Sequence, residues 1–403
     1  MSPHLFRNLV LGCLSSRRLS VIALIVFIWL LHSQLLGSSI NQHNPHADKK
    51  PAKHRVEDAP RFLYHSSSGV DLDVEYERYL SDALKEIEQA AGGQDVAEER
   101  IWQITKDEKH RGSESALFEE KNSDWEYTLM TDEKAAAFVI DELSTVPEIA
   151  TVYESYPYDV LRADLLRYLL LWYYGGFYAD MDVFPARPIR ECSALQRLFP
   201  PQGDYPANVS LVVGIELDEP YASSSRMREW HWTRTYGLIQ YTMYAPRRFS
   251  PLLRQIIVRA LAHTRQYQRH HNSLFGYRQE DILRLTGPDV FTDTILDMLS
   301  SSLPPTHPLI QRSVDADETI GDLNTEQKRV TWAPFHGLRE TVCIEASEAI
   351  PEASMGGICV LPVSVWGNGQ RHSQAEGFNS PQACINHLFK GSWKKGWKNY
   401  IFG

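Results

Sequence analysis

Two aspartates one residue apart, Asp180 and Asp182, follow a Gly-Gly break and a short apolar segment in the sequence GGFYADMD. Side chains at positions i and i+2 of a strand point to the same side, so we expect both carboxylates to converge on one hard cation. Two carboxylates with open coordination positions suit Mg²⁺ or Mn²⁺, which keep room for phosphate oxygens of a substrate. A divalent ion stabilises a leaving diphosphate, so the pattern predicts a metal-dependent transferase that uses a nucleotide-linked donor.

The same spacing occurs once more, at Asp71 and Asp73. No Gly-Gly turn or apolar strand precedes that triplet, and we interpret it as a solvated segment. The context, and not the spacing alone, therefore distinguishes Asp180 and Asp182.

A second pair of chemically useful residues, Asp164 and Arg167, lies just upstream on an expected helix. Residues three apart on a helix are neighbours, so the two side chains can pair. One interpretation is a surface salt bridge. The other is a donor site, in which Asp164 binds sugar hydroxyls and Arg167 binds the diphosphate.

Strand and helix patterns alternate through the rest of the chain, which indicates an α/β fold with a mostly parallel sheet. In such sheets, ligands bind at the carboxyl ends of the strands, where Asp180 and Asp182 are expected. We expect strands at 100–105, 125–130, 177–179 and 209–217, and helices at 70–91, 133–143, 157–174, 252–261 and 289–299.

The N-terminal segment differs in character from the rest. Residues 19–36 are mostly apolar and long enough to approach the thickness of a bilayer, and Arg7, Arg17 and Arg18 precede them. By the positive-inside rule we expect a cytosolic tail (1–18), an uncleaved transmembrane signal anchor (19–36), a polar stem (37–95) and a lumenal catalytic domain (96–403). A cleavable signal peptide is the alternative.

Composition narrows the functional classes further. The net charge of -10 argues against a nucleic-acid partner. In a secretory compartment, four cysteines could form two disulfides in any of three pairings, or remain as free buried thiols. These are Cys192, Cys343, Cys359 and Cys384, and Asn208 lies in a glycosylation sequon.

Several segments, taken in order, resemble glycosyltransferase family 32, and within it the fungal initiation-specific alpha-1,6-mannosyltransferases. The Asp164 helix and the Asp180 triplet carry the family resemblance. The other three motifs match the subgroup. One lies near the start of the predicted catalytic domain, one in its second half and one near its end. The segments read IWQ at 101–103, VLRADLLRYL at 160–169, GGFYADMD at 175–182, GPDVFTD at 287–293 and HLFKGSWK at 387–394.

The resemblance implies a GT-A (Rossmann-like) fold, a GDP-mannose donor, Mn²⁺ (with Mg²⁺ as the alternative), retention of configuration and a Golgi membrane location. It implies an N-glycan acceptor with an alpha-1,6 linkage, and a complex with other mannosyltransferases. Asp180 and Asp182 would act as catalytic metal ligands together with His387. The implied donor contacts are Trp102, Asp164, Arg167 and Lys394.

One position departs from the family pattern, because Thr105 stands where the opening motif usually has a second aromatic residue. Two other functions therefore stay open: mannosyl transfer to an inositol-phosphoryl sphingolipid, and a catalytically silent subunit of a mannan-synthesising complex. Retention also raises the question of a nucleophile. Asp289 and Asp293 are interpreted as acids at a helix N-terminus, without a catalytic role.

Overall fold

The computed structural model describes residues 73–93, 96–200, 206–270, 277–320, 329–351 and 355–390. They belong to one folded unit, 58–403. The predicted tail and anchor lie outside the described residues. Within the described ranges, no helix is both long enough and apolar enough to cross a membrane.

A mixed sheet forms the centre of this unit, with strands in the order β2-β1-β3-β7-β5-β9-β8 and with β6 paired to β5. The pairs β1–β2, β1–β3 and β5–β9 are parallel, and the other pairs are antiparallel. The strands are β1 Arg100–Ile104, β2 Glu126–Met130, β3 Gly176–Ala179, β5 Leu211–Asp218, β6 Tyr236–Leu238, β7 Thr242–Ala245, β8 Val342–Ile344 and β9 Ile358–Leu361.

The prediction of an α/β fold is confirmed, but that of a mostly parallel sheet is wrong. Strands β6 and β7 are short and follow each other closely, so they lacked the long alternating patterns on which the prediction depended. β7 lies between β3 and β5 and runs antiparallel to both.

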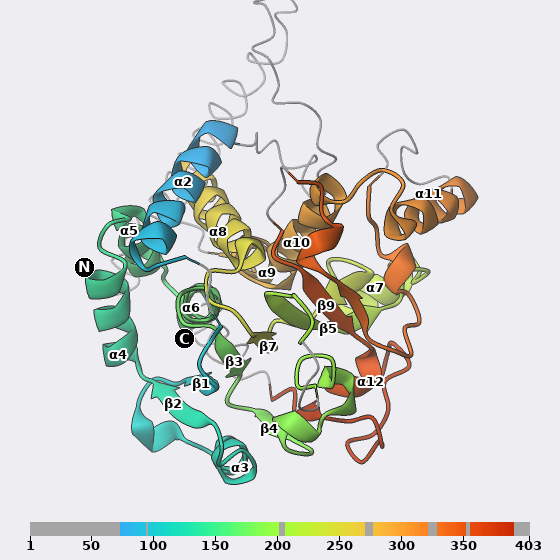
Figure 1. Cartoon of the computed structure of the whole chain (residues 1–403), viewed down its shortest axis with the longest axis horizontal. Helices are drawn as coiled ribbons and strands as arrows, with labels where there is room; N and C mark the ends of the chain where they lie inside the picture. The colour runs from blue at the N-terminus through green and yellow to red at the C-terminus, as the bar shows by residue number, and fades with distance from the viewer. Residues whose placement is uncertain are drawn as a thin grey trace, which may run out of the picture. The chain divides into compact units, whose positions relative to one another are not determined.

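Helices cover both faces of the sheet. Figure 1 shows α2, α6, α8 and α10 on one side of it and α3 and α12 on the other. The helices are α2 Val74–Ala90, α3 Ser113–Lys121, α4 Asp132–Ala137, α5 Pro147–Ser155, α6 Asp159–Tyr173, α7 Ser224–Trp230, α8 Pro251–His270, α9 Gln279–Leu285, α10 Pro288–Ser302, α11 Pro308–Ile320 and α12 Val363–Trp366.

Alternation along the strands divides the buried side chains between two cores. In β1, Ile101 packs into the core beneath α3 and α12, whereas Trp102 packs beneath α6 and α8. Phe177 and Tyr178 of β3 divide in the same way. Successive strand residues point to opposite faces, so a sheet buried on both faces needs apolar residues at consecutive positions.

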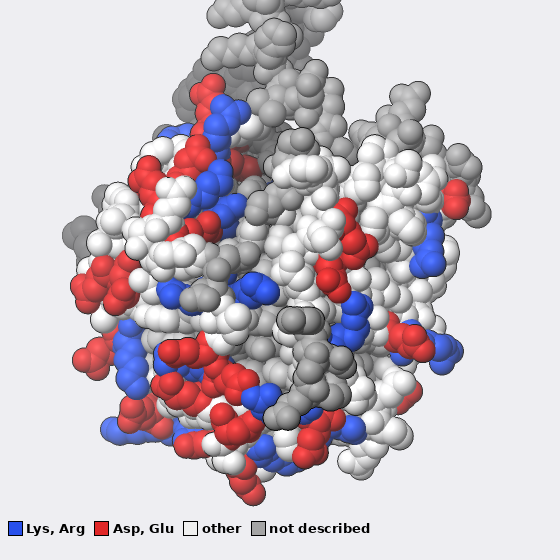
Figure 2. All heavy atoms as spheres, in the orientation of Figure 1, with Lys and Arg blue, Asp and Glu red and all other residues white. Residues whose placement is uncertain are grey.

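Helix α2 packs on α8 and belongs to the first of these cores, although its sequence falls within the predicted stem interval, 37–95. Its residues Leu80, Leu84 and Ile87 are buried. Asp73, from the second Asp-x-Asp triplet, caps the helix by accepting a hydrogen bond from the backbone N–H of Tyr76 at 3.2 Å. Figure 2 shows acidic and basic side chains intermixed over α2 at the upper left and along the lower part of this face.

A two-stranded antiparallel sheet adjoins the central one, formed by β4 Val183–Pro185 and β10 Ile385–His387. Disulfides join Cys192 to Cys384 and Cys343 to Cys359. The first links the segment after β4 to the residue before β10. The second joins register partners in β8 and β9. Of the three pairings that the sequence allowed, the structure contains this one.

Candidate active site

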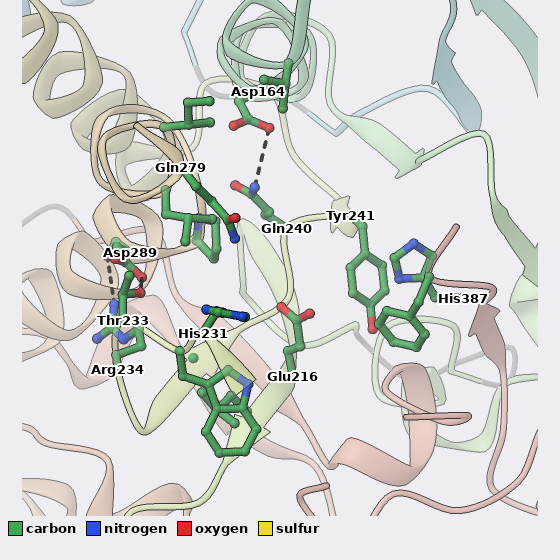
Figure 3. Close-up of a pocket in the computed structure, with 18 of the residues that line it drawn as sticks. Asp164, Glu216, His231, Thr233, Arg234, Gln240, Tyr241, Gln279, Asp289 and His387 are labelled. Atoms are coloured by element: carbon green, nitrogen blue, oxygen red, sulfur yellow. Dashed lines mark hydrogen bonds between the residues drawn. The ribbon is translucent and has the colours of Figure 1, made fainter. Parts of the chain in front are cut away.

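A cavity of about 420 Å³ opens beyond the end of β3 and contains most of the predicted site residues. Figure 3 shows Asp164 and Gln240 at one end, His387 beside Tyr241, and Asp289 near Thr233 and Arg234 on the opposite side. The other lining residues named below are Arg167, Asp180, Asp182, Glu216, Trp230, His231, Trp232, Gln279 and His372.

The Gly-Gly break directs the chain from α6 into β3. Gly175 and Gly176 have φ angles of +70° and +92°, a region that favours glycine. A Cβ on Gly176 would also lie 2.5 Å from the backbone oxygen of Arg100 in β1. The two glycines therefore permit both the turn and the close approach of β3 to β1.

Asp180 and Asp182 both line the cavity, but neither lies in a strand, on which the predicted convergence of their carboxylates depended. Strand β3 ends at Ala179, and a hydrogen bond of 3.1 Å from Val183 N–H to the Asp180 carbonyl closes a turn. Strand alternation therefore does not set the directions of these two side chains, because the residues lie in this turn. The Tyr178 hydroxyl donates a 2.6 Å hydrogen bond to Asp180.

Asp164 and Arg167 form the predicted ion pair at 2.8 Å, and the alternative of a surface salt bridge is wrong, because their side chains are only 3% and 6% exposed. Arg167 also lies 3.5 Å from the carboxylate of Asp180. Its Nη1 donates to the backbone oxygen of Gln240 at 3.2 Å. The α6 pair is thereby connected directly to the Asp180 turn.

Three groups surround the Asp164 carboxylate. Besides Arg167, Thr286 donates a 3.0 Å hydrogen bond to it and the Gln240 amide a 3.4 Å one. Burial raises the pKa of Asp164 to about 6, against the opposing effect of the Arg167 charge. Hydrogen bonds and a nearby cation favour the charged form of a buried carboxylate, and Asp164 lines the cavity with these partners around it.

The Arg167 guanidinium is a permanent buried cation. Burial lowers its pKa, but the carboxylates of Asp180 and Asp164 and the phenol of Tyr178 raise it more, so that the pKa lies above its usual range. Among the described residues, its Nε atom is buried and has no hydrogen-bond partner. A buried, unsatisfied N–H of a guanidinium is suited to an anionic ligand such as a diphosphate.

His387 comes from the far end of the chain and meets Asp182 directly. Its Nε2 lies 3.1 Å from Asp182 Oδ1, and the backbone N–H of Lys390 donates to Asp182 Oδ2 at 3.0 Å. Burial raises the pKa of Asp182, but the hydrogen bonds from His387 and Lys390 outweigh it, and the net shift is downward. The ladder between β4 and β10 pairs His387 with Val183, next to this aspartate.

These residues fit a divalent cation by the chemistry of their donor atoms. Carboxylate oxygens and an imidazole nitrogen suit Mn²⁺ or Mg²⁺, and Asp180, Asp182 and His387 supply them around one cavity. As they stand in the described part of the chain, no three His, Cys, Asp or Glu side chains are arranged around a single ion position. Asp180 instead faces Tyr178 and Arg167.

Residues of the opening IWQ motif hold the backbone of the Gly-Gly break and of the Asp180 turn through hydrogen bonds. Trp102 is buried in the core, where its indole N–H donates to the Gly175 carbonyl at 2.9 Å, and it does not line the cavity. The neighbouring Gln103 donates to the backbone oxygen of Asp180 at 3.1 Å. Thr105 is buried and bonds to the Asp107 carbonyl at 3.2 Å. Lys394 lies outside the described residues.

Sequence reasoning missed several cavity residues and assigned Asp289 no role. Glu216, Gln240 and Tyr241 lie on or beside β5 and β7, and no motif or spacing singles them out. Asp289 was interpreted only as an acid at a helix N-terminus, yet it lines the cavity. Only the folded arrangement relates these residues to the site.

Comparison with known proteins agrees with this geometry. Residues 107–199 match a family model described as "Glycosyltransferase sugar-binding region containing DXD motif". The chain is 26% identical over 302 residues to the initiation-specific alpha-1,6-mannosyltransferase of Candida albicans, covering 73% of this chain and 71% of that protein. It is 47% identical over 60 residues to inositol phosphoceramide mannosyltransferase 3 of Schizosaccharomyces pombe, covering 15% of this chain and 16% of that protein.

Among solved structures, the PaToxG glycosyltransferase covers 66% of this chain and 92% of its own, at 17% identity and a TM-score of 0.35, a likeness too weak to bear on the fold. The match to the family model is a match of sequence and does not depend on that structure. It spans α6, β3 and the Asp180 turn, and α6 and this turn both contribute residues to the cavity lining. The resemblance to glycosyltransferase family 32 is thus confirmed, and the chain is a glycosyltransferase enzyme that carries this DXD-containing region.

Proposed function

We propose that this glycosyltransferase is a Golgi alpha-mannosyltransferase that moves mannose from GDP-mannose to an N-glycan acceptor. The reaction forms an alpha-1,6 linkage with retention of configuration and depends on Mn²⁺. The proposal includes a GT-A (Rossmann-like) catalytic domain over 96–403, which faces the lumen behind a stem and a single-pass anchor at 19–36. It also includes a complex with other mannosyltransferases.

One observation carries the proposal: a single cavity brings together the Asp180–Asp182 turn, His387 and the buried Asp164–Arg167 pair. Such a combination suits a nucleotide-sugar donor, because the diphosphate needs positive charge and the sugar needs hydrogen-bond acceptors. The relatives named as mannosyltransferases favour mannose as the sugar.

The residues divide into roles by position. A divalent ion, when bound, would stabilise the negative charge that develops on the leaving diphosphate, and Asp180, Asp182 and His387 would hold it. The Arg167 guanidinium, with its unsatisfied Nε, would bind the diphosphate. The Asp164 carboxylate would accept hydrogen bonds from the mannose hydroxyls, and Thr286 and Gln240 would fix its orientation.

The decisive experiment measures transfer from GDP-mannose, and release of GDP, by the full chain with and without Mn²⁺. We expect activity only with the metal, and we expect Asp182→Asn to reduce it by at least about a hundredfold, because an electrostatic contact at the leaving group is worth that much. Asp73→Asn is the matched control. It alters the second aspartate of the other triplet, and asparagine caps a helix as well as aspartate does.

Two outcomes would contradict the proposal. Full activity of Asp182→Asn would remove the metal assignment. Failure of the wild-type chain to bind any nucleotide sugar, as a shift in melting temperature with Mn²⁺ present, would favour the silent-subunit interpretation. The short match to a ceramide mannosyltransferase makes inositol phosphorylceramide the second acceptor to test.

A further inference from the structure

The cavity extends beyond the proposed donor and metal residues to three aromatic rings, which we call the aromatic cluster: Trp230, Trp232 and His372. The two indoles stack with centroids 5.4 Å apart and planes 26° apart. His372 meets both edge-on, at 5.3 Å from Trp230 and 4.9 Å from Trp232. All three rings line the cavity and are partly exposed, and the proposed donor chemistry uses none of them.

The end of α7 holds the two tryptophans in place. His231 has a φ of 55° and ends the helix in a left-handed conformation, and the Trp232 N–H donates to the Met227 carbonyl at 2.9 Å. This is a Schellman motif with histidine in the position that usually belongs to glycine. A non-glycine residue there costs about 1 kcal/mol or more, and His231 lines the cavity (Figure 3).

Asp218, at the end of β5, and Glu219, which follows it, hold the backbone next to His372 through Ser373. The backbone N–H of Ser373 donates to Glu219 at 2.7 Å, and the Ser373 hydroxyl accepts a 2.8 Å hydrogen bond from the backbone N–H of Asp218. Burial lowers the pKa of His372, so its ring is neutral at physiological pH. The contacts of Ser373 thus fix the backbone that carries the His372 ring of the aromatic cluster.

Asp289 adds a polar group at the same side of the cavity. It is 2% exposed, and its Oδ1 accepts a 3.0 Å hydrogen bond from the Thr233 hydroxyl. Its Oδ2 is buried and has no hydrogen-bond partner among the described residues. A buried carboxylate oxygen without a partner is costly, and a ligand hydroxyl in the cavity would satisfy it.

The charges around this region favour an uncharged ligand. Arg226 faces Trp232 and pairs with Glu219 at 3.3 Å, and Arg234 pairs with Asp293 at 2.7 Å. Both cations are thus neutralised, and the carboxylate of Asp289 would repel a phosphate. Aromatic faces with a few placed polar groups are typical of sites for small neutral ligands.

We propose that the aromatic cluster and Asp289 form the acceptor subsite, which binds a neutral hexopyranose at the end of a glycan. The C–H face of the sugar ring would pack on the cluster, and one of its hydroxyls would donate to Asp289. Figure 3 shows Asp289 across the cavity from His387, so acceptor and metal residues occupy different sides. The inference rests on the proposed function, since it assigns the second substrate of the same cavity.

The test measures binding of two probes to the full chain without donor: a neutral α-linked mannotetraose and myo-inositol phosphate. Titrations use isothermal calorimetry on wild type, Trp230→Ala, Trp232→Ala and Asp289→Asn. We expect the wild type to prefer the neutral glycan, and each variant to bind it at least about tenfold more weakly, as expected when a buried anchor is truncated. Tyr221→Ala is the control, an aromatic residue 72% exposed and outside the cavity lining.

Three outcomes would overturn the inference. The first is equal binding of the glycan by wild type and both tryptophan variants. The others are a preference of the wild type for inositol phosphate, and no binding of the glycan by the wild type. If an alanine variant fails to fold, Trp232→Leu and Asp289→Asn still decide the matter. Binding of GDP-mannose with Mn²⁺ is measured separately on the same proteins. If the wild type binds the glycan but does not bind GDP-mannose, the result would contradict the proposed donor and not the acceptor subsite.

Discussion

His387 Nε2 lies 3.1 Å from Asp182 Oδ1, although 205 residues separate the two along the chain. The backbone of Leu388 also donates to the Asp182 carbonyl at 3.0 Å. The ladder between β4 and β10, with the Cys192–Cys384 disulfide beside it, holds this contact. The chemistry of the Asp180 turn therefore depends on the C-terminal segment.

Replacement of His387 tests whether the imidazole is a metal ligand. We expect His387→Gln to weaken Mn²⁺ binding by at least about tenfold, since even outer-shell partners contribute that much. Electron paramagnetic resonance of free Mn²⁺ during titration gives the affinity directly. His270→Gln, at the exposed end of α8, should leave the affinity unchanged. An unaltered affinity in His387→Gln would leave only the two aspartates as ligands.

Removal of the Cys192–Cys384 disulfide should affect the site as well as the fold. We expect Cys192→Ala with Cys384→Ala to lower the free energy of unfolding by about 4–5 kcal/mol, because the closed loop is long, and to weaken Mn²⁺ binding. The matched control removes Cys343 and Cys359, whose separation is only 16 residues. That double variant should lose stability but bind Mn²⁺ normally. Equal effects of the two double variants on metal affinity would contradict the proposed role of β10.

The raised pKa of Asp164 predicts a pH dependence of stability. The folded-state pKa of about 6 exceeds the ordinary value of 3.8, so the folded state binds more protons between these values. The contribution of Asp164 to stability is fully present below about pH 3.8 and is lost as the pH rises through about 6. Urea unfolding without metal, from pH 4 to pH 7, should show this fall in wild type relative to Asp164→Asn. A constant difference between the two proteins would show that Asp164 keeps an ordinary pKa.

Helix α2 should be part of the catalytic unit. Leu84 is fully buried against the core that α8 shares, so we expect Leu84→Ala to cost about 2–5 kcal/mol of unfolding free energy. Thermal or urea unfolding of the chain measures the loss. Lys85→Ala, one residue on and exposed at 44%, is the control and should change stability by less than about 0.5 kcal/mol. No loss in Leu84→Ala would assign α2 to the stem.

Much of the local structure was predictable because its signals are local. Apolar periodicity and the Gly-Gly break predicted α6 and β3, and α6 begins at Asp159, two residues later than expected. Spacing of three on that helix predicted the Asp164–Arg167 pair. The Asp-x-Asp triplet in its context singled out Asp180 and Asp182, which both line the cavity, and their role as metal ligands stays a prediction.

Tertiary structure alone decided the rest, because the deciding contacts join segments distant in the sequence. The insertion of β7 between β3 and β5 made the sheet mixed. Packing of α6 against its neighbours converted the Asp164–Arg167 pair from a possible surface bridge into a buried one. Gln240 and the aromatic cluster belong to no motif, and Asp289 lies in the GPDVFTD motif without a predicted role in the site. Only the fold brings these residues to the cavity. Residue types and spacing thus determined the kind of chemistry, whereas long-range packing determined which side chains take part in it.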